Sequence, residues 1–494
     1  MAIVVVQVGQ CGNQLGDELW RQLSIATDKG AVRSPFFTRD RLARCVLVDS
    51  EPKVVQAVQG RHADIMRKEN TVCGNSGRGN HWALGYYGLS NPASKRNAEK
   101  ALPHKPFQLT RDQRQDDNCV VRDALRAIYA ETRRTKDAEE FEAILLLHSL
   151  AGGTGSGMTS LLIEKIRYYF IEPSPWGEGT TPVDELEEAA RMREDGLDGM
   201  LMEKRRAMFL VSVSVAPQSV GEVATQGLNA AMTLRALRNV DAVILLRNDD
   251  CIRVQRDTAP GSGVQSRSAS TKLAQGNTED KLASSSSVTS LVNPCSTFTE
   301  VNEVFVTLLM PILLYGRGES PLCDLVLKCS PNHRKIHNIL TVVPTPQRHY
   351  LRFKKSVILS RLYCVTGARI HLPGVHPDVP VGILHTDNSL RAENSVHTRG
   401  DVQVPKALLE SFTGSPARRR SPASVLLQNM EGVLVMNEAR ELNASLLFPL
   451  LYMATMKAKV GAFMTTFVDA GMTVEQVQAA IRDAAERLAD AEDV

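Results

Sequence analysis

Ala151-Gly152-Gly153-Thr154-Gly155-Ser156-Gly157 is the stretch that decides the fold of this chain of 494 residues. It follows Ala143–His148, an apolar run that predicts a strand, and it precedes Met158–Phe170, where apolar residues recur at helical spacing. Glycines let backbone amides approach a ligand, and a helix N-terminus adds free N–H groups and a positive dipole end. A flexible linker is rarely held between two such elements, so the sequence predicts a phosphate-binding loop.

Two common phosphate-binding motifs do not occur in the sequence. There is no G-x-x-x-x-G-K-[ST], and no G-x-G-x-x-G opens a helix after a strand. The first predicted strand runs instead into Val8-Gly9-Gln10-Cys11-Gly12-Asn13-Gln14. A metabolic α/β enzyme that binds a dinucleotide is therefore the least favoured of the functions considered.

Length and composition exclude several classes of protein. A chain of this length is expected to form two or three domains, and 43% hydrophobic with 23% charged residues is typical of a globular protein. The net charge of 58 − 55 = +3 does not indicate a nucleic-acid partner. The nine cysteines are dispersed without a C-x-x-C pair, which favours a reduced, cytoplasmic setting. The N-terminus enters a predicted strand at once, so we expect neither secretion nor a membrane partner.

Strand-like and helix-like runs alternate through the first half of the sequence. Alternation with nearly continuous apolar strands predicts a parallel sheet with helices on both faces, and ligands then bind at the carboxyl ends of the strands. Strands are expected at Ile3–Val8, Cys45–Val48, Ala143–His148, Met208–Val215 and Ala242–Leu246, and helices at Asn13–Leu23, Pro52–Val58, Val120–Arg134, Met158–Phe170 and Asn229–Leu237. Gly9-Gln10, Asp49–Glu51, Gly152–Gly157 and Arg247-Asn248 all fall at such ends.

Three polar stretches interrupt this pattern, at residues 89–118, 172–205 and 258–290, and the last is rich in serine and predicts a disordered loop. Ser415–Pro422 is a basic loop, which is either a solvated turn or a docking or phosphorylation site. The chain closes with two helical runs that separate near Gly471. Val474, Val477, Ile481 and Leu488 lie on one face of the second run and predict a packing surface.

Together, the glycine run and Val8–Gln14 resemble the tubulin superfamily. The resemblance implies an α/β fold with a doubly wound parallel-sheet nucleotide-binding domain, a smaller α/β intermediate domain and a C-terminal helical hairpin. It places the GTP-binding domain at 1–297, the central helix and intermediate domain at 298–438, and the C-terminal helices at 439–494. Arg399-Gly400-Asp401-Val402 and Lys457–Leu488 extend the resemblance beyond the first domain. The implied cofactors are GTP or GDP and Mg²⁺.

The phosphate-binding residues that the resemblance implies come from three segments. Asn75–Ala83 resembles the family loop G-x-G-N-N-W-A, with His81 in place of the second Asn. Arg78 either adds a phosphate contact or is solvated, as an exposed arginine in a glycine loop usually is. The implied set is Gly9, Gln10, Cys11, Gly79, Asn80, Ser149, Gly152, Gly153, Thr154 and Gly155.

Asp49 and Glu51 follow the predicted strand Cys45–Val48 and form a candidate metal site. Two carboxylates near a phosphate suit Mg²⁺, which usually keeps much of its water shell. An N-cap for the helix that starts at Pro52 would by itself explain one acid here, and both roles are compatible. In tubulins the matching D-x-E-P element contacts the metal, so the resemblance gives this role to Glu51.

The residues expected to recognise the base come from two separate segments. An amide side chain pairs with the edge of guanine, and an aromatic face stacks on it. The resemblance assigns these roles to Asn248, Phe298 and Asn302, where Phe298 replaces the family's Tyr and loses its hydroxyl. The alternative is that Phe298 and Asn302 merely begin a helix. Glu222 is the candidate for the ribose contact.

The resemblance implies weak or partner-triggered hydrolysis of GTP. In tubulin filaments a neighbouring subunit supplies the activating acid, and in the matching segment Ser320–Lys328 that position is Leu327, which cannot activate water. Asp324 remains a weak candidate for a catalytic acid that acts on a neighbour's nucleotide.

Val48–Val55 and Ser149–Gly153 are most similar to δ-, ε- and ζ-type tubulins. This likeness implies an accessory cytoskeletal protein at centrioles, basal bodies or flagella, with other tubulins or the proteins of those structures as partners. The alternative is a GTP-locked binding or scaffold module that never polymerises, which the three polar stretches would favour by blocking lateral packing.

Overall fold

The structure is a computed structural model. The residues that it describes are 2–27, 34–88, 119–134, 141–171, 207, 209–218, 223–251, 295–313, 322, 326, 339–346, 362–366, 421–423, 426, 430–437 and 440–489. The polar stretches at 89–118, 172–205 and 258–290, Arg399–Val402 and nearly all of the basic loop Ser415–Pro422 lie outside these ranges.

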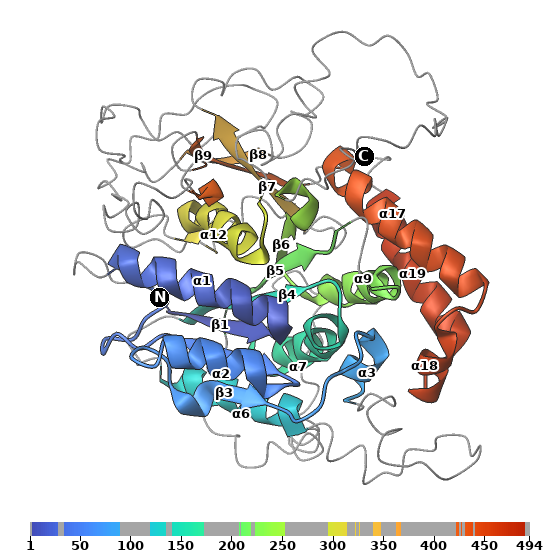
Figure 1. The fold of residues 1–494 in the computed structure, drawn as a ribbon, viewed down its shortest axis with the longest axis horizontal. Helices are drawn as coiled ribbons and strands as arrows, with labels where there is room; N and C mark the ends of the chain where they lie inside the picture. The colour runs from blue at the N-terminus through green and yellow to red at the C-terminus, as the bar shows by residue number, and fades with distance from the viewer. Residues whose placement is uncertain are drawn as a thin grey trace, which may run out of the picture.

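One sheet organises the described residues, with the strand order β3-β2-β1-β4-β5-β6-β7-β9-β8 (Figure 1). The first seven of these strands are parallel to one another. Strand order reverses between β1 and β4, which confirms the predicted doubly wound sheet. The bounds are Ala2–Val8 for β1, Cys45–Asp49 for β2, Thr71–Cys73 for β3, Phe141–Ser149 for β4, Phe209–Ala216 for β5, Ala242–Arg247 for β6 and Ile339–Pro346 for β7.

Two antiparallel strands extend the same sheet beyond β7. β9 (Met430–Asn437) pairs with β7, and β8 (Leu362–Thr366) pairs with β9. β7, β8 and β9 come from residues 298–438, the range predicted to hold the central helix and intermediate domain. These strands are joined to the parallel part of the sheet by continuous strand pairing.

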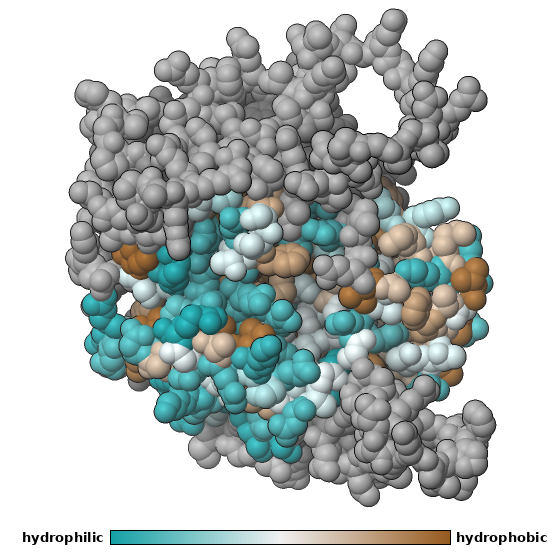
Figure 2. Space-filling view, viewed as in Figure 1, coloured by the Kyte–Doolittle hydropathy of each residue, from teal (hydrophilic) through white to brown (hydrophobic). Residues whose placement is uncertain are grey.

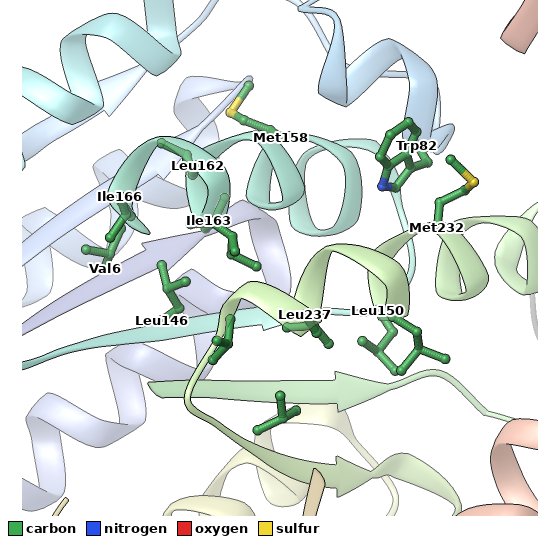
Figure 3. Close-up of a cluster of buried hydrophobic side chains, with 14 of the residues drawn as sticks. Val6, Trp82, Leu146, Leu150, Met158, Leu162, Ile163, Ile166, Met232 and Leu237 are labelled. Carbon is green, nitrogen blue, oxygen red and sulfur yellow. The ribbon is translucent and has the colours of Figure 1, made fainter. Parts of the chain in front are cut away.

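Residues of the central strands alternate between two hydrophobic cores, one on each face of the sheet. In β1, Val4 and Val6 belong to the first core, whereas Ile3 and Val5 belong to the second. Figure 3 shows the first core, where Val6 and Leu146 lie beside side chains of α7 (Thr159–Phe170). Burial of each aliphatic side chain stabilises the fold by about 1.5–3 kcal/mol. Because both faces of these strands are covered, every position gains from an apolar residue, and the strands appear in the sequence as continuous apolar runs.

Each core is covered by its own set of helices. The second core is covered by α1 (Gly9–Thr27), α2 (Pro52–Arg61) and α12 (Phe298–Leu313). The first core is covered by α3 (Trp82–Tyr86), α6 (Cys119–Arg133), α7 and α9 (Gln226–Ala236). The bounds of α1, α2, α6, α7 and α9 agree with the sequence-based expectations to within a few residues, whereas α3 was not predicted.

The C-terminal helices are α17 (Arg440–Lys459), α18 (Met464–Asp469) and α19 (Val474–Ala489). α17 and α19 pack on each other and on α9, along one side of the molecule in Figure 1. Gly471, with φ +97°, separates α18 from α19 as predicted. Val477 and Ile481 are buried, which confirms the packing role of that helix face.

Large exposed apolar side chains are concentrated on these C-terminal helices. Phe448, Tyr452, Met456 and Val460 recur every four residues, so they share one face of α17 and its C-terminal end. The brown side chains of this region stand at the right of Figure 2. Among the described residues, no helix combines the length and the apolar composition that crossing a bilayer requires.

The contact between α1 and α12 contains a carboxyl group whose protonation affects stability. The pKa of Glu303 is raised to about 7, mainly by burial and also by the neighbouring charges of Glu18 and Glu300, whereas Arg21 opposes the rise. The folded protein therefore holds this proton more tightly than the unfolded chain, and stability is lost as the pH rises from about 4.5 towards 7.

We expect Glu303→Gln to stabilise the protein at pH 8 and to change little at pH 5, because the neutral amide cannot ionise. The gain should be on the order of 1 kcal/mol after solvent screening. Chemical denaturation at the two pH values measures it. The matched control is Glu486→Gln on the exposed face of α19, which should behave alike at both pH values. An equal effect of Glu303→Gln at pH 5 and pH 8 would contradict the assignment.

Candidate functional site

The candidate site lies where strand order reverses. β2, β1, β4 and β6 are parallel strands of one sheet, with β5 between β4 and β6, so their carboxyl ends reach the same edge. These strands end at Val8, Asp49, Ser149 and Arg247, each directly before a predicted site segment. β1 and β4 flank the reversal itself, which is where open α/β sheets bind ligands.

The glycine run forms a helical N-terminus at this point. A π-helical turn spans Gly153–Met158 and leads directly into α7, so the helix begins earlier than the predicted Met158. Gly152 precedes it with φ +87°, a conformation that favours glycine. Every residue from Gly153 to Gly157 is buried, which excludes the flexible-linker alternative. The turn therefore presents free N–H groups at a fixed position, as anion binding requires.

The loop that follows β1 lies directly against this turn. Gly9 has φ +74°, and a Cβ atom at Gly9 would lie 2.8 Å from the amide nitrogen of Gly155. Asn13 is buried and donates from Nδ2 to the carbonyl of Gly9 at 2.9 Å and to that of Val48 at 3.0 Å. Gln10 is exposed beside them, whereas burial raises the pKa of the Cys11 thiol to about 12.

A buried histidine supports the turn from inside the sheet. His148 Nδ1 lies 3.0 Å from the carbonyl oxygen of Gly155, and Nε2 lies 2.8 Å from Ser212 Oγ and 2.9 Å from Ser214 Oγ. Carbonyl oxygens only accept, so Nδ1 carries the proton and Nε2 accepts from a hydroxyl. Burial lowers the pKa of His148 to about 4, which keeps the ring neutral. Because Gly155 C=O points to His148, the adjacent Ser156 N–H points the opposite way.

The loop that follows β2 joins the turn through two hydroxyl groups. Ser50 Oγ and Thr154 Oγ1 are 2.6 Å apart, and the amide of Ser50 donates to Asp49 Oδ1 at 2.7 Å. The pKa of Asp49 is raised to about 6, mainly by burial. Hydrogen bonds from the backbone N–H groups of Ser50 and Glu51 oppose this rise. Glu51 is the N-cap residue of α2, but its side chain makes no capping hydrogen bond. Glu51 therefore stands at the N-cap position, but its exposed carboxylate is not used for capping and is available to a metal ion.

The oxygen groups at this edge fit a magnesium ion that keeps water and phosphate ligands. Within the described ranges, no three His, Cys, Asp or Glu side chains form a cluster able to hold a metal. Mg²⁺ in nucleotide sites is typically held by only one or two carboxylates together with phosphates and water. A Cβ atom at Gly77 would lie 3.0 Å from Glu51 Oε1, which places this carboxylate beside the loop that leads to Asn80.

Asn80 is held in a conformation that its backbone rarely adopts. Its φ is +52°, and its carbonyl accepts from Thr225 Oγ1 at 2.7 Å and from Asn229 Nδ2 at 2.9 Å. Asn229 Oδ1 also accepts from the amide of Trp82 at 2.9 Å. Asn229 in α9 and Thr225 directly before α9 thus fix the loop. The Asn80 side chain itself stays exposed.

Arg78 and His81 both have structural contacts. Arg78 is only 4% exposed and donates from Nη1 to the carbonyl of Gly88 at 3.1 Å, so the solvated alternative is wrong. His81 is the N-cap of α3, where Nδ1 accepts from the amide of Ala83 at 3.3 Å. Its ring centroid lies 4.5 Å from that of Phe467 in α18, which connects the loop to the C-terminal helices.

The predicted base-recognition residues come from two segments that meet. Asn248 begins a 3₁₀ turn after β6, and its carbonyl accepts from the amide of Cys251 at 3.0 Å. The amide of Cys295 donates to the carbonyl of Cys251 at 2.9 Å, which brings the start of α12 to this turn. Phe298 is 50% exposed, and outside the C-terminal helices it is the only large exposed apolar side chain in the described ranges.

Two predicted residues cannot be placed, because Glu222 and Asp324 lie outside the described residues, as does Leu327. Three others that matter were missed by sequence reasoning: Ser50, His148 and Asn229. Ser50 stands between two candidate metal ligands, and this position was an available signal. His148 and Asn229 sit inside a strand and a helix, where nothing in a single sequence marks a buried polar residue as part of a site.

Comparison with known proteins agrees with this geometry. The family model described as "Tubulin/FtsZ family, GTPase domain" matches residues 2–101. The chain is 32% identical over 200 residues to a tubulin beta chain of Pyropia yezoensis, which covers 35% of this chain and 37% of that one. A tubulin beta chain of Porphyra purpurea gives the same values, and the nucleomorph tubulin beta chain of Guillardia theta gives 31%, 35% and 38%. The matched region therefore spans little more than a third of each relative.

Proposed function

We propose that this chain, which is similar to tubulins over part of its length, is a tubulin-like cytoskeletal protein of the tubulin superfamily that binds a guanine nucleotide. The observation that carries the proposal is the convergence of four strand ends on one helical N-terminus. Three phosphate-side loops are held together by the contacts Ser50–Thr154, Gly9–Gly155 and Arg78–Gly153. Phe298 is exposed on the segment that the backbone hydrogen bond from Cys295 to Cys251 joins to the Asn248 turn.

In this proposal the phosphates lie against the Gly153–Met158 turn and the loops at Gly9–Cys11 and Gly79-Asn80. The base is recognised by Asn248, Asn302 and the face of Phe298, and Glu222 reaches the ribose. Asp49 and Glu51 hold Mg²⁺ mainly through water. When bound, this ion would neutralise phosphate charge, while the residues of the chain bind and orient the nucleotide.

We further propose that hydrolysis is weak until a partner supplies an acid. Leu327 occupies the position where the resemblance expects a catalytic Glu, and Asp324 is the remaining acid of that segment. Other tubulins are the proposed longitudinal partners. An accessory role at centrioles, basal bodies or flagella in the cytoplasm is the finer proposal, supported by the sequence of Val48–Val55 and Ser149–Gly153 alone.

The first test is to identify the nucleotide released when gently purified protein is denatured, before and after incubation with Mg²⁺. We expect GTP that persists, because no neighbouring subunit is present to supply the activating acid. GDP that accumulates without a partner would contradict partner-triggered hydrolysis. Protein that is empty and does not bind added GTP would overturn the nucleotide site. Sedimentation with a second tubulin then separates an assembling protein from the non-polymerising alternative.

Replacement of the exposed aromatic ring tests base recognition directly. We expect Phe298→Ala to weaken GTP binding by about 1–3 kcal/mol, roughly 5- to 150-fold, because a base loses its stacking partner. Equilibrium titration with a fluorescent guanine nucleotide measures the change. Phe448→Ala, which removes a 37% exposed ring from α17, is the matched control and should leave affinity unchanged. Equal affinity in both variants would place the base elsewhere.

A further inference from the structure

Cys251 and Cys295 are 44 positions apart in the sequence and meet behind the proposed base site. Their backbones share the 2.9 Å hydrogen bond from the Cys295 amide to the Cys251 carbonyl. The side chains are 2% and 5% exposed, and the Cys295 side chain lies close enough to the Cys251 thiol to raise its pKa. Both are free cysteines in the structure.

This geometry suits a disulfide bond. A backbone hydrogen bond between two residues brings their α-carbons into the range of about 4.4–6.8 Å that disulfides span. At this spacing of the two backbones, rotation of the side chains brings the two sulfur atoms together. The other three cysteines whose side chains the structure describes, Cys11, Cys45 and Cys73, have no such neighbour among the described residues.

We propose that Cys251 and Cys295 form a dithiol–disulfide pair that exchanges with small-molecule disulfides such as oxidised glutathione. The thiolate of Cys295 attacks one sulfur of the oxidant, the oxidant's S–S bond breaks, and one glutathione leaves. The thiolate of Cys251 then attacks the mixed disulfide, and the second glutathione leaves. Both thiol protons are released and taken up by the two departing thiolates, so the dithiol is oxidised while the glutathione disulfide is reduced.

The order of the two steps follows from the surroundings. Ser296, Thr297 and Phe298, directly after Cys295, are all exposed, so a small local opening at the start of α12 is enough to expose Cys295. Interaction of the Cys251 thiol, as donor, with the Cys295 side chain and then burial hold the pKa of Cys251 well above its usual range. Cys251 is therefore the poorer nucleophile towards an external oxidant and acts second, and oxidation should accelerate as the pH rises.

The disulfide would join the two segments that carry the proposed base-recognition residues. Asn248 is three residues before Cys251, and Phe298 is three residues after Cys295. This consequence rests on the proposed function: a covalent link holds both segments in the binding arrangement and slows nucleotide dissociation. We expect a slowing of about 3- to 10-fold, as preorganisation lowers the cost of ordering the site.

The test treats the whole purified chain with oxidised glutathione, digests it without reductant and analyses the peptides by mass spectrometry. We expect one peptide pair linked through Cys251 and Cys295, with the loss of two hydrogen atoms. Cys251→Ala should instead trap a single glutathione on Cys295. The exposed Cys73 is the internal control, because it should gain only a mixed disulfide. The wild-type peptide map alone decides the matter if a variant does not fold.

The possible results are distinguishable. Both thiols remaining free, or each carrying its own glutathione, would overturn the pair. A linked pair with an unchanged rate of nucleotide dissociation would overturn the coupling to the base site and leave the pair standing. A linked pair in a protein that binds no guanine nucleotide would contradict the proposed function only.

Discussion

Gly85→Ala should be among the most damaging single substitutions in the described part of the chain. A Cβ atom at Gly85 in α3 would lie 1.9 Å from the carbonyl oxygen of Gly153 and 2.9 Å from the amide nitrogen of Met158. Both atoms are backbone atoms of the glycine turn, so no side chain can rotate away. The clash must separate α3 from the turn, and overpacking of this kind costs about 3 kcal/mol or more. GTP affinity should fall more than about tenfold, because the N–H groups at Gly153 would move.

Gly60→Ala is the matched control for this prediction. Gly60 is exposed in α2, and a Cβ atom there would meet nothing within 4 Å. The same substitution should therefore stabilise the protein by about 0.5 kcal/mol, since alanine loses less backbone entropy in a helix. Chemical denaturation and nucleotide titration of both variants measure the two opposite effects. A Gly85→Ala protein that unfolds and binds like its parent would show that α3 does not contact the turn.

The sequence was sufficient to predict the five central strands β1, β2, β4, β5 and β6, but it did not predict β3, β7, β8 or β9. Apolar runs such as Ala143–His148 are buried on both faces, and this burial leaves a pattern that a single sequence displays. The glycine run could also be predicted from the sequence, because glycine is needed where φ is positive or where another part of the backbone packs closely. Its helical turn was nevertheless predicted to start too late, since residues 153–157 have low helix propensity and are held by tertiary contacts.

The supporting residues of the site were less predictable for a physical reason. The roles of His148, Ser212 and Ser214 depend on pairing between β4 and β5, which places His148 opposite Ser214. Asn229 acts on a loop almost 150 residues earlier, and the Cys251–Cys295 contact joins positions separated by a long polar stretch. Long-range contacts of this kind become visible only when the topology is known, whereas periodicity reports only which face of an element is buried.

Asn229→Ala should cost about 3 kcal/mol of stability and should weaken nucleotide binding more than about tenfold. The side chain is fully buried and joins the Asn80 carbonyl to the Trp82 amide. Its loss leaves the buried Trp82 N–H without an acceptor, and an unsatisfied buried donor costs about 1–3 kcal/mol. The Asn80 carbonyl also loses one of two donors that hold φ at +52°, so the loop is free to relax away from the phosphates.

Thr225→Val separates these two effects. It removes the other donor to the Asn80 carbonyl and leaves the Trp82 amide paired with Asn229. We therefore expect a smaller loss of stability, about 1 kcal/mol, together with a measurable loss of nucleotide affinity. Asn239→Ala, at an exposed position, should change stability by less than about 0.5 kcal/mol. If Asn229→Ala destabilised the fold yet bound nucleotide normally, the conformation of Asn80 would not matter for binding. An affinity loss in both Asn229→Ala and Thr225→Val would instead identify that conformation as the shared cause.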